Sequence, residues 1–505
     1  MYRTSAQITS AIQILSLWFP NFFSQRQLPE NSVQGQAIYA LLLRAGGGGE
    51  RRAVLIVGGT HARELMNPDA IVELAIDLFL SYVNGTDIVY GNRRWNADDI
   101  KLMLESLDIW MIPCSNPDGR DEVMNVDSLW RKNMRVNAGS TCLGVDLNRN
   151  SDIVWGVAQG QTSCSPCTDI YCGPGAFSEP ETRNVKALLD SASVVSFVDV
   201  HSYSELVLYP WGHAPTQSSD PSQVFTTLPT GTCTASVPAS YKEYMPAIDV
   251  QRFQSVSSQI VADIRAVRGR QYIPETGLAL YPTTGTQSDY AYARHIADPK
   301  LYKTYGFTFE TGPLADTTDD SFHPPDPTLI KLDAKAGMIS LLEQSVCAIE
   351  LIGLDLFGSG GLQAFRRIRD EVLASTAAGR EWVALFERLQ FRLLARVIAS
   401  RQLTQQAKEI LRTVGGLLKD QGQEITAQSA RHAEAFVREL LAKTKDAARR
   451  RDLAKVLKEV KRVAGRRVEA VVAALMGRRS TERRVETDKK RGSKRSARPR
   501  PKGRK

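Results

Sequence analysis

The sequence predicts an α/β domain followed by an all-α extension, and three features of its 505 residues support this division. Up to about residue 350, short runs of apolar and β-branched residues alternate with helical patterns, whereas strand-like runs vanish from about residue 361. The charge changes sign as well. Residues 351–505 contain 38 Lys and Arg against 17 Asp and Glu, whereas residues 1–350 are acidic overall. We expect a domain at 1–350, a helical extension at 361–476 and a basic, disordered tail at 477–505.

The first clear strand is "AVLIVGG", residues 53–59, an apolar run that ends in two glycines. A helix is predicted over residues 67–83, with Asn67 as its N-cap and Pro68 at the first helical position. Further strands are predicted at 107–114, 194–202 and 305–312, and a further helix at 178–192. Strands interleaved with helices indicate a sheet that is buried on both faces.

The extension reads as amphipathic helix throughout its length. Its apolar positions recur at helical spacing, first at Trp382, Leu385, Phe386, Leu389 and Leu393, and then at Leu453, Val456, Leu457, Val460 and Val463. No run of 18 or more apolar residues occurs, so no transmembrane segment is predicted.

Ionisable residues follow three of the predicted strands. His61 and Glu64 come just after the first strand, His201 ends another, and Glu310 ends a third. Ligands of α/β proteins collect at the carboxyl ends of strands, and two imidazoles with a carboxylate are a ligand set of catalytic zinc. An HxxE pair also arises by chance in many proteins. Three separate strand ends that each carry a group a buried sheet would exclude favour a site.

A series of motifs carries a wider resemblance. In order they are "HARE" (61–64), "NPDG" (116–119), "LWRKN" (129–133), "GVDLNRN" (144–150), "HSYSELVLYPWG" (201–212), "LYPTTGTQSD" (280–289) and "FTFETG" (307–312). Over about residues 5–350 the chain resembles the zinc metallocarboxypeptidases of the carboxypeptidase A/B type. The resemblance implies a mixed β-sheet flanked by helices, and a catalytic domain that removes C-terminal residues from peptides.

The same resemblance assigns roles to individual residues. It makes His61, Glu64 and His201 the ligands of one Zn²⁺ per chain. It makes Glu310 the catalytic carboxylate, and Arg131 the arginine that polarises the scissile carbonyl. Substrate binding falls to Asn148, Arg149, Tyr203, Tyr281 and Ser288, of which Asn148 and Arg149 grip the terminal carboxylate and Tyr281 closes over the peptide.

These residue types suit the chemistry on their own terms. A carboxylate such as Glu310 can accept a proton from the attacking water and deliver it to the leaving amine. Arg131 offers a fixed positive charge where an oxyanion develops, and Arg149 offers a planar fork that fits a carboxylate. The charge on Asp146 can either orient a ligand imidazole or cap a turn.

The specificity pocket is predicted to be neutral. Ser288 stands at the position that lines its base in the relatives, and Leu208, Leu280, Thr283 and Thr308 match other positions of the pocket. We expect apolar or aromatic C-terminal residues to be released, with mixed specificity as the second choice.

Seven cysteines are present, and Cys142, Cys164, Cys167 and Cys172 fall close together. Disulfides are favoured over free thiols, and the resemblance suggests the pairs Cys142–Cys167 and Cys164–Cys172. Disulfides favour an extracellular location. The absence of a recognisable signal peptide favours the cytoplasm. No inhibitory pro-segment is expected, because the match begins almost at residue 5.

Two other functions compete with this one. The chain could be a binding or scaffold protein that engages nucleic acid or an anionic surface through its basic helical tail. The tail lacks the interleaved aromatic residues of base-stacking proteins, so nucleic-acid binding is disfavoured. Alternatively, the enzyme could hydrolyse amides of cell-wall peptides. A peptide or protein substrate with a free C-terminus and a monomeric chain are the leading expectations.

Overall fold

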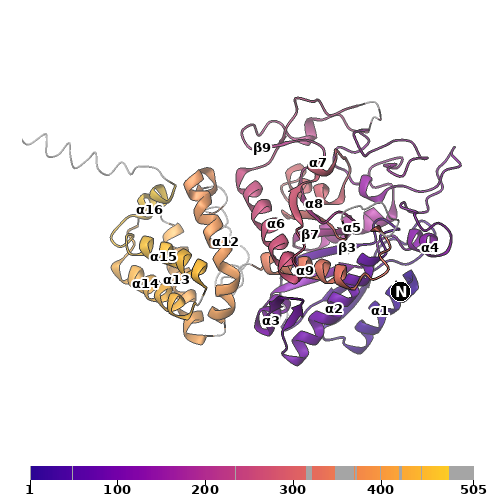
Figure 1. Ribbon diagram of the computed structural model, residues 1–505. Helices are drawn as coiled ribbons and strands as arrows, with labels where there is room; N and C mark the ends of the chain where they lie inside the picture. The colour runs from indigo at the N-terminus through magenta and orange to yellow at the C-terminus, as the bar shows by residue number, and fades with distance from the viewer. Residues whose placement is uncertain are drawn as a thin grey trace, which may run out of the picture. The chain divides into compact units, whose positions relative to one another are not determined.

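The computed structural model divides the chain into two compact units, Met1–Cys347 and Ala348–Lys505, which are described separately (Figure 1). The described residues are 2–313 without 48, 232 and 234, then 321–346, 365, 369, and 372–476 without 399, 420–422 and 445. The predicted tail at 477–505 lies outside them. Among the described residues, no helix is both long and apolar enough to cross a bilayer.

The first unit contains one large sheet with helices around it. Its strands are β1 (Phe23–Gln27), β2 (Tyr39–Leu43), β3 (Arg52–Gly58), β4 (Ile88–Tyr90), β5 (Arg93–Trp95), β6 (Leu107–Ile112), β7 (Val194–His201), β8 (Leu206–Tyr209), β9 (Thr216–Gln217), β10 (Glu243–Tyr244), β11 (Ile273–Thr276) and β12 (Tyr305–Glu310). Its α-helices are α1 (Ser5–Trp18), α2 (Met66–Asn84), α3 (Ala97–Ser106), α4 (Pro117–Asn125), α5 (Pro180–Ser191), α6 (Ala247–Arg268), α7 (Gly277–Leu280), α8 (Gln287–Ala297) and α9 (Thr328–Ser345).

Eight strands form the sheet, in the order β1-β2-β6-β3-β7-β12-β8-β11. The central strands β6, β3, β7 and β12 are parallel to one another. Antiparallel pairs join β1 to β2, β2 to β6, and β12 to β8. The predicted mixed sheet flanked by helices is therefore confirmed.

Helices cover both faces of the sheet. All eight residues of β7 are buried. Helix α8 packs on β12 and β7 from the face that carries Thr308, whose hydroxyl donates to Ser288 Oγ at 3.0 Å. Helix α9 covers the opposite face, because Gly337 of α9 lies against Phe309, the neighbour of Thr308 along the strand. The central strands therefore expose little except their carboxyl ends.

Helix α2 begins slightly earlier than predicted. Its first residue is Met66, and Asn67 lies inside the helix and does not cap it. The Asn67 side chain instead donates to Ser202 Oγ at 3.0 Å and accepts from Thr311 Oγ1 at 2.8 Å. The predicted N-cap was wrong because this buried amide is used to join the ends of β7 and β12.

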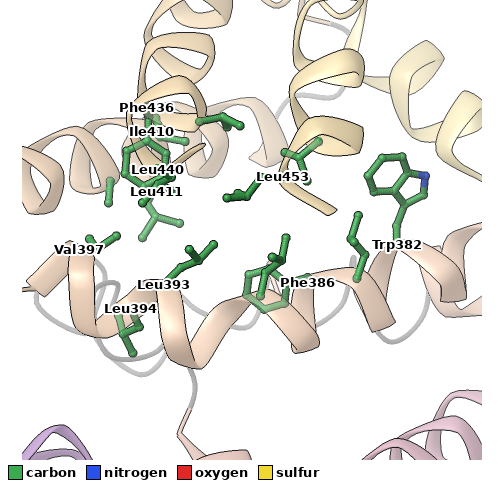
Figure 2. A pocket seen from close by; sticks show the side chains of 15 residues that line it. Trp382, Phe386, Leu393, Leu394, Val397, Ile410, Leu411, Phe436, Leu440 and Leu453 are labelled. Carbon is green, nitrogen blue, oxygen red and sulfur yellow. The ribbon is translucent and has the colours of Figure 1, made fainter. Parts of the chain in front are cut away.

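The second unit is helical, as predicted for the extension. Its described α-helices are α12 (Ala377–Ile398), α13 (Arg401–Lys419), α14 (Ala427–Lys443), α15 (Ala447–Val460) and α16 (Val468–Leu475). Helix α12 contacts α13, and α14 contacts both α13 and α15. The predicted apolar positions Trp382, Phe386 and Leu453 point into the space between these helices (Figure 2).

Candidate active site

Three of the predicted site residues form a buried cluster at the carboxyl ends of β3 and β7. Gly58 of β3 pairs with Val200 of β7, so the segment that follows β3 lies beside His201. Gly59 has φ +67°, a conformation that glycine adopts without strain, and the chain turns there towards His61 and Glu64. The register of two parallel strands thus brings together residues that are 140 positions apart in sequence.

The donor atoms of this cluster converge on one point. His61 Nδ1 lies 2.7 Å from Glu64 Oε1, and His201 Nδ1 lies 2.9 Å from His61 Nδ1 and 3.0 Å from Glu64 Oε2. One ligand atom from each residue lies within 4.8 Å of the others, so the cluster could hold a metal ion. Each imidazole turns Nδ1 inward, which leaves Nε2 for a second partner.

A carboxylate stands behind each imidazole. Asp146 Oδ1 lies 3.2 Å from His61 Nε2, and Asp199 Oδ2 lies 2.7 Å from His201 Nε2. Such carboxylates fix the tautomer and the orientation of a metal-binding imidazole. Burial opposes the charged form of His201, but Asp199 and Glu64 raise its pKa well above the ordinary value in the metal-free chain. A divalent metal at this nitrogen would displace the proton. The donor set and its supporting carboxylates therefore fit a divalent metal such as zinc.

Asp146 serves both of the uses that the sequence left open. Besides its contact with His61, it accepts a hydrogen bond from the backbone of Asn148 at 2.9 Å and so caps the short 3₁₀ turn Leu147–Arg149. Its Oδ2 also accepts from Nε and Nη2 of Arg131, both at 3.0 Å. Burial opposes ionisation of Asp146, but Arg131 and the other nearby cations hold its pKa well below the usual range.

Glu310 ends β12 directly opposite His201 in the sheet register. It lines a pocket together with His61 and Arg131. Burial raises the pKa of Glu310 to about 8, with His201 opposing the rise and Glu64 adding to it. In the metal-free chain this carboxyl group therefore exchanges its proton near neutral pH.

The same pocket collects most of the predicted substrate-binding residues. Asn148, Arg149, Tyr281 and Ser288 line it. Tyr203 does not, because its ring packs edge-on against Phe322 at 4.9 Å. The structure thus groups nine of the ten predicted residues in the pocket or its metal cluster, and Tyr203 lies to one side.

Arg149 has an unusual environment for a buried cation. Only 2% of it is exposed, and its guanidinium donates to the backbone carbonyls of Asn148, at 2.6 Å, and Gln161. Within the described part of the chain, no carboxylate pairs with it. Burying an unpaired charge is costly. Arg149 therefore places a buried positive charge in the wall of the pocket.

The side walls of the pocket are largely neutral. Leu208, Thr283, Ser288 and Thr308 are all more than 90% buried there. Asp289 also lines the pocket, but its Oδ2 accepts from Gly212 N at 2.9 Å and lies 3.9 Å from His213 Nδ1. This carboxylate already has partners in the wall.

The sequence analysis did not identify two features, namely Asp199 and the buried contact between His213 and Glu243 that holds the segment after Gly212. Asp199 could have been recognised, because it is a carboxylate in a buried, mostly apolar strand, two positions before His201 and so on the same face. The anchoring of the later segment had no such signal. His213 Nε2 lies 2.9 Å from Glu243 Oε2, and both side chains are fully buried.

One of the two predicted disulfides was wrong. Cys142 pairs with Cys167 as expected, but Cys164 pairs with Cys233. Cys172 is a buried free thiol whose Sγ lies 4.0 Å from that of Cys164. Gly231 donates to the carbonyl of Trp155 at 2.8 Å, so the long segment that contains Cys233 returns over this loop. Cys233, distant in sequence, thereby takes the place that we predicted for Cys172.

The Cys233→Ser variant is expected to lower the free energy of unfolding by about 2–4 kcal/mol, because the bond closes a loop of roughly 70 residues. Denaturant unfolding of the oxidised chain measures this loss. Cys172→Ser is the matched control and should leave both disulfides intact in non-reducing peptide maps. A Cys164–Cys172 peptide from the parent chain would contradict the assignment.

Comparisons with known proteins agree with this geometry. The family model described as zinc carboxypeptidase matches residues 8–336. Mouse carboxypeptidase A4 is 27% identical over 314 residues, which is 62% of each chain. Bovine thrombin-activatable fibrinolysis inhibitor, solved with tick carboxypeptidase inhibitor, shares the fold with a TM-score of 0.53 and 22% identity, over 68% of this chain and 97% of that one.

The matches span between 60% and 70% of the length of the first five carboxypeptidase relatives. A stretch of 170 residues is also 35% identical to the inactive metallocarboxypeptidase ECM14 of Arthroderma otae, covering 32% of this chain and 26% of that protein. The relatives of this chain therefore include a protein that is named inactive. The family model covers well over half of the residues, and the chain belongs to the zinc carboxypeptidase family.

Proposed function

We propose that the chain is a zinc-dependent carboxypeptidase that releases one residue at a time from peptides with a free C-terminus. The observation that carries the proposal is the buried guanidinium of Arg149, which forms no ion pair with any described carboxylate and shares a pocket with His61 and Glu310. A substrate carboxylate would supply the missing negative charge. A peptide bound in this way presents its last amide bond to the metal cluster.

Zinc would be held by His61, Glu64 and His201. When bound, it supplies a Lewis acid for the scissile carbonyl and lowers the pKa of a bound water towards 7. Asp146 and Asp199 keep the two imidazoles in the orientation that coordination requires.

The protein groups around the metal cluster transfer the proton, stabilise the developing charge and bind the substrate. Glu310 accepts a proton from the attacking water and delivers it to the leaving amine. Arg131, fixed by Asp146, places a positive charge where the carbonyl oxygen becomes negative. Asn148 and Arg149 hold the terminal carboxylate, and Tyr281 closes the open side of the pocket. Tyr203 would contact a peptide only outside the pocket that these residues line.

The neutral walls favour an apolar or aromatic terminal side chain. Leu208 and Leu280 contribute apolar surface, and Ser288 and Thr308 are hydrogen-bonded to each other. Asp289 is engaged with Gly212 and His213, so a basic side chain would have to compete for it. Mixed specificity remains the second choice.

The proposed function is tested by incubating the purified full-length chain with zinc and a set of peptides that differ only in their last residue. Stepwise release from free-acid peptides, with fastest release of Phe or Leu, supports the proposal. Internal cleavage, or no release from any free-acid peptide by a chain that contains zinc, would reject it.

The metal assignment predicts that His201→Ala loses zinc. Outer partners of a metal ligand are worth about 10- to 100-fold in affinity, so Asp199→Asn is expected to weaken zinc binding by that factor, and His201→Ala by more. Competition with a zinc chelator measures both effects. Exposed His432 provides the control, because His432→Ala should keep one zinc per chain. One tightly bound zinc in His201→Ala would refute the ligand set.

A further inference from the structure

A buried imidazole lies behind the wall of the substrate pocket, and it has no part in the proton transfer or in metal binding. His213 is only 1% exposed and directly follows Gly212, which lines the pocket. Its Nε2 lies 2.9 Å from Glu243 Oε2. Its Nδ1 lies 3.9 Å from Asp289 Oδ2 and has no hydrogen-bond partner among the described residues. The unbonded side of the imidazole thus faces a carboxylate of the pocket wall.

Two carboxylates flank His213 and favour its charged form. Glu243 is held in place by the Tyr241 hydroxyl, which donates to Oε2 at 2.6 Å, and by the backbone N–H of Phe225, which donates to Oε1 at 3.0 Å. Burial opposes protonation of His213, but Asp289 and Glu243 together raise its pKa above the ordinary value. His213 is therefore an imidazolium at and below about pH 6.5, and it loses its proton at a higher pH.

The charge of His213 determines how strongly Asp289 attracts a cation. Asp289 lines the pocket beside the neutral side chains of Ser288 and Thr308. While His213 is an imidazolium, its positive charge lies next to Asp289 and offsets much of the attraction that this carboxylate exerts on a cationic ligand. When His213 is neutral, that attraction is restored. A substrate guanidinium gains from this change, and a neutral side chain does not.

We propose that His213 is a specificity-determining residue, which makes the pocket disfavour Lys and Arg while it is protonated and admits them once it is neutral. This inference rests on the proposed carboxypeptidase function and deepens it. Neutral C-terminal residues are accepted at every pH, and basic ones are accepted increasingly as the pH rises. Mixed specificity then becomes a property of the pH and not of the pocket shape alone.

The test compares two N-terminally blocked peptides that end in Arg or in citrulline, which has nearly the same shape as Arg but no charge. Ionisation of Glu310 and of the metal cluster affects both peptides alike, so the ratio of the two kcat/KM values isolates the effect of the substrate charge. Arg itself stays charged throughout. The Arg-to-citrulline ratio is expected to rise about tenfold between pH 6 and pH 9. A constant ratio over this range would overturn the proposal.

Two variants locate the effect. His213→Gln keeps a hydrogen-bond donor for Glu243 but cannot become charged, so its ratio should equal the high-pH value of the parent at every pH. His295→Gln is the matched control on α8, because burial lowers the pKa of His295 to about 4 and this imidazole stays neutral over the range tested. Its ratio should follow the profile of the parent. A His213→Gln ratio that still changes with pH as in the parent would reject the role of His213.

A second measurement does not require turnover. The affinities of the zinc-loaded full-length chain for free L-arginine and L-citrulline are compared by calorimetry, and the His213 imidazole is titrated by NMR. The preference for arginine should appear over the pH interval in which His213 loses its proton, which tests the proposal even where His213→Gln is unstable. A preference that does not follow this titration would overturn it.

Failure of the proposed function is recognised separately. If neither peptide is cleaved but arginine binding follows the His213 titration, the carboxypeptidase proposal fails and the effect of His213 on the pocket is supported. If both peptides are cleaved at a constant ratio, the enzyme is supported and the role of His213 is rejected.

Discussion

Replacing Glu310 by Gln is expected to reduce kcat by about 10²- to 10⁴-fold while the metal remains bound. The amide has nearly the same shape as the carboxyl group but cannot take up a proton from water. His61, Glu64 and His201 are unchanged in the variant, so zinc content should stay at one per chain. Peptide binding should also persist, because Arg149 is untouched.

The measurement combines zinc analysis, steady-state kinetics and the affinity for an uncleaved peptide. Glu243→Gln is a suitable comparison, because it makes the same chemical change at another buried glutamate, the partner of His213. It should alter stability and pocket shape more than turnover. Cleavage by Glu310→Gln at close to the parent rate would exclude Glu310 as the proton-transfer group.

The Arg149→Met variant is expected to lose about 30- to 1000-fold in kcat/KM on peptides with a free C-terminus. A charge-assisted contact in a buried pocket is worth roughly 2–4 kcal/mol, which corresponds to this range. Because Arg149 forms no ion pair among the described residues, the loss should be confined to substrates that carry the carboxylate.

The measurement compares four values of kcat/KM, for the parent and for the variant, each on a free-acid peptide and on its C-terminal amide. The amide should be cleaved slowly by both enzymes and at nearly equal rates. Arg183→Met is the control, because Arg183 pairs with Glu30 and does not line the pocket. Equal losses on both peptides would mean that Arg149 only supports the fold. A parent enzyme that cleaves amides as fast as acids would remove the basis for an exopeptidase.

Much of the candidate site could be predicted, because the ends of buried strands can be recognised in the sequence. A buried parallel strand appears as an apolar run, and the first ionisable residues after it must lie at its carboxyl end. His61, His201 and Glu310 follow from that rule. The sheet register then determines that they meet, and periodicity alone does not reveal a register.

Side-chain partners were harder to predict than elements. Asn67 suited an N-cap by its type and position, but its amide is used between Ser202 and Thr311. Cys164 had a nearer cysteine in sequence than the one it bonds. In both cases the side chain pairs with residues distant in sequence and not with the local partner that we predicted. Local sequence patterns carry no information about such distant contacts.

The bond between Cys164 and Cys233 has a practical consequence for handling the protein. Gln161, three residues before Cys164, supplies a backbone carbonyl that orients Arg149. A thiol reductant in the purification buffer would release this loop and leave the coordinating side chains untouched. Preparations of equal purity and metal content could then differ in apparent substrate affinity. A preparation with low apparent substrate affinity should therefore be compared with an oxidised sample before the low affinity is assigned to the protein itself.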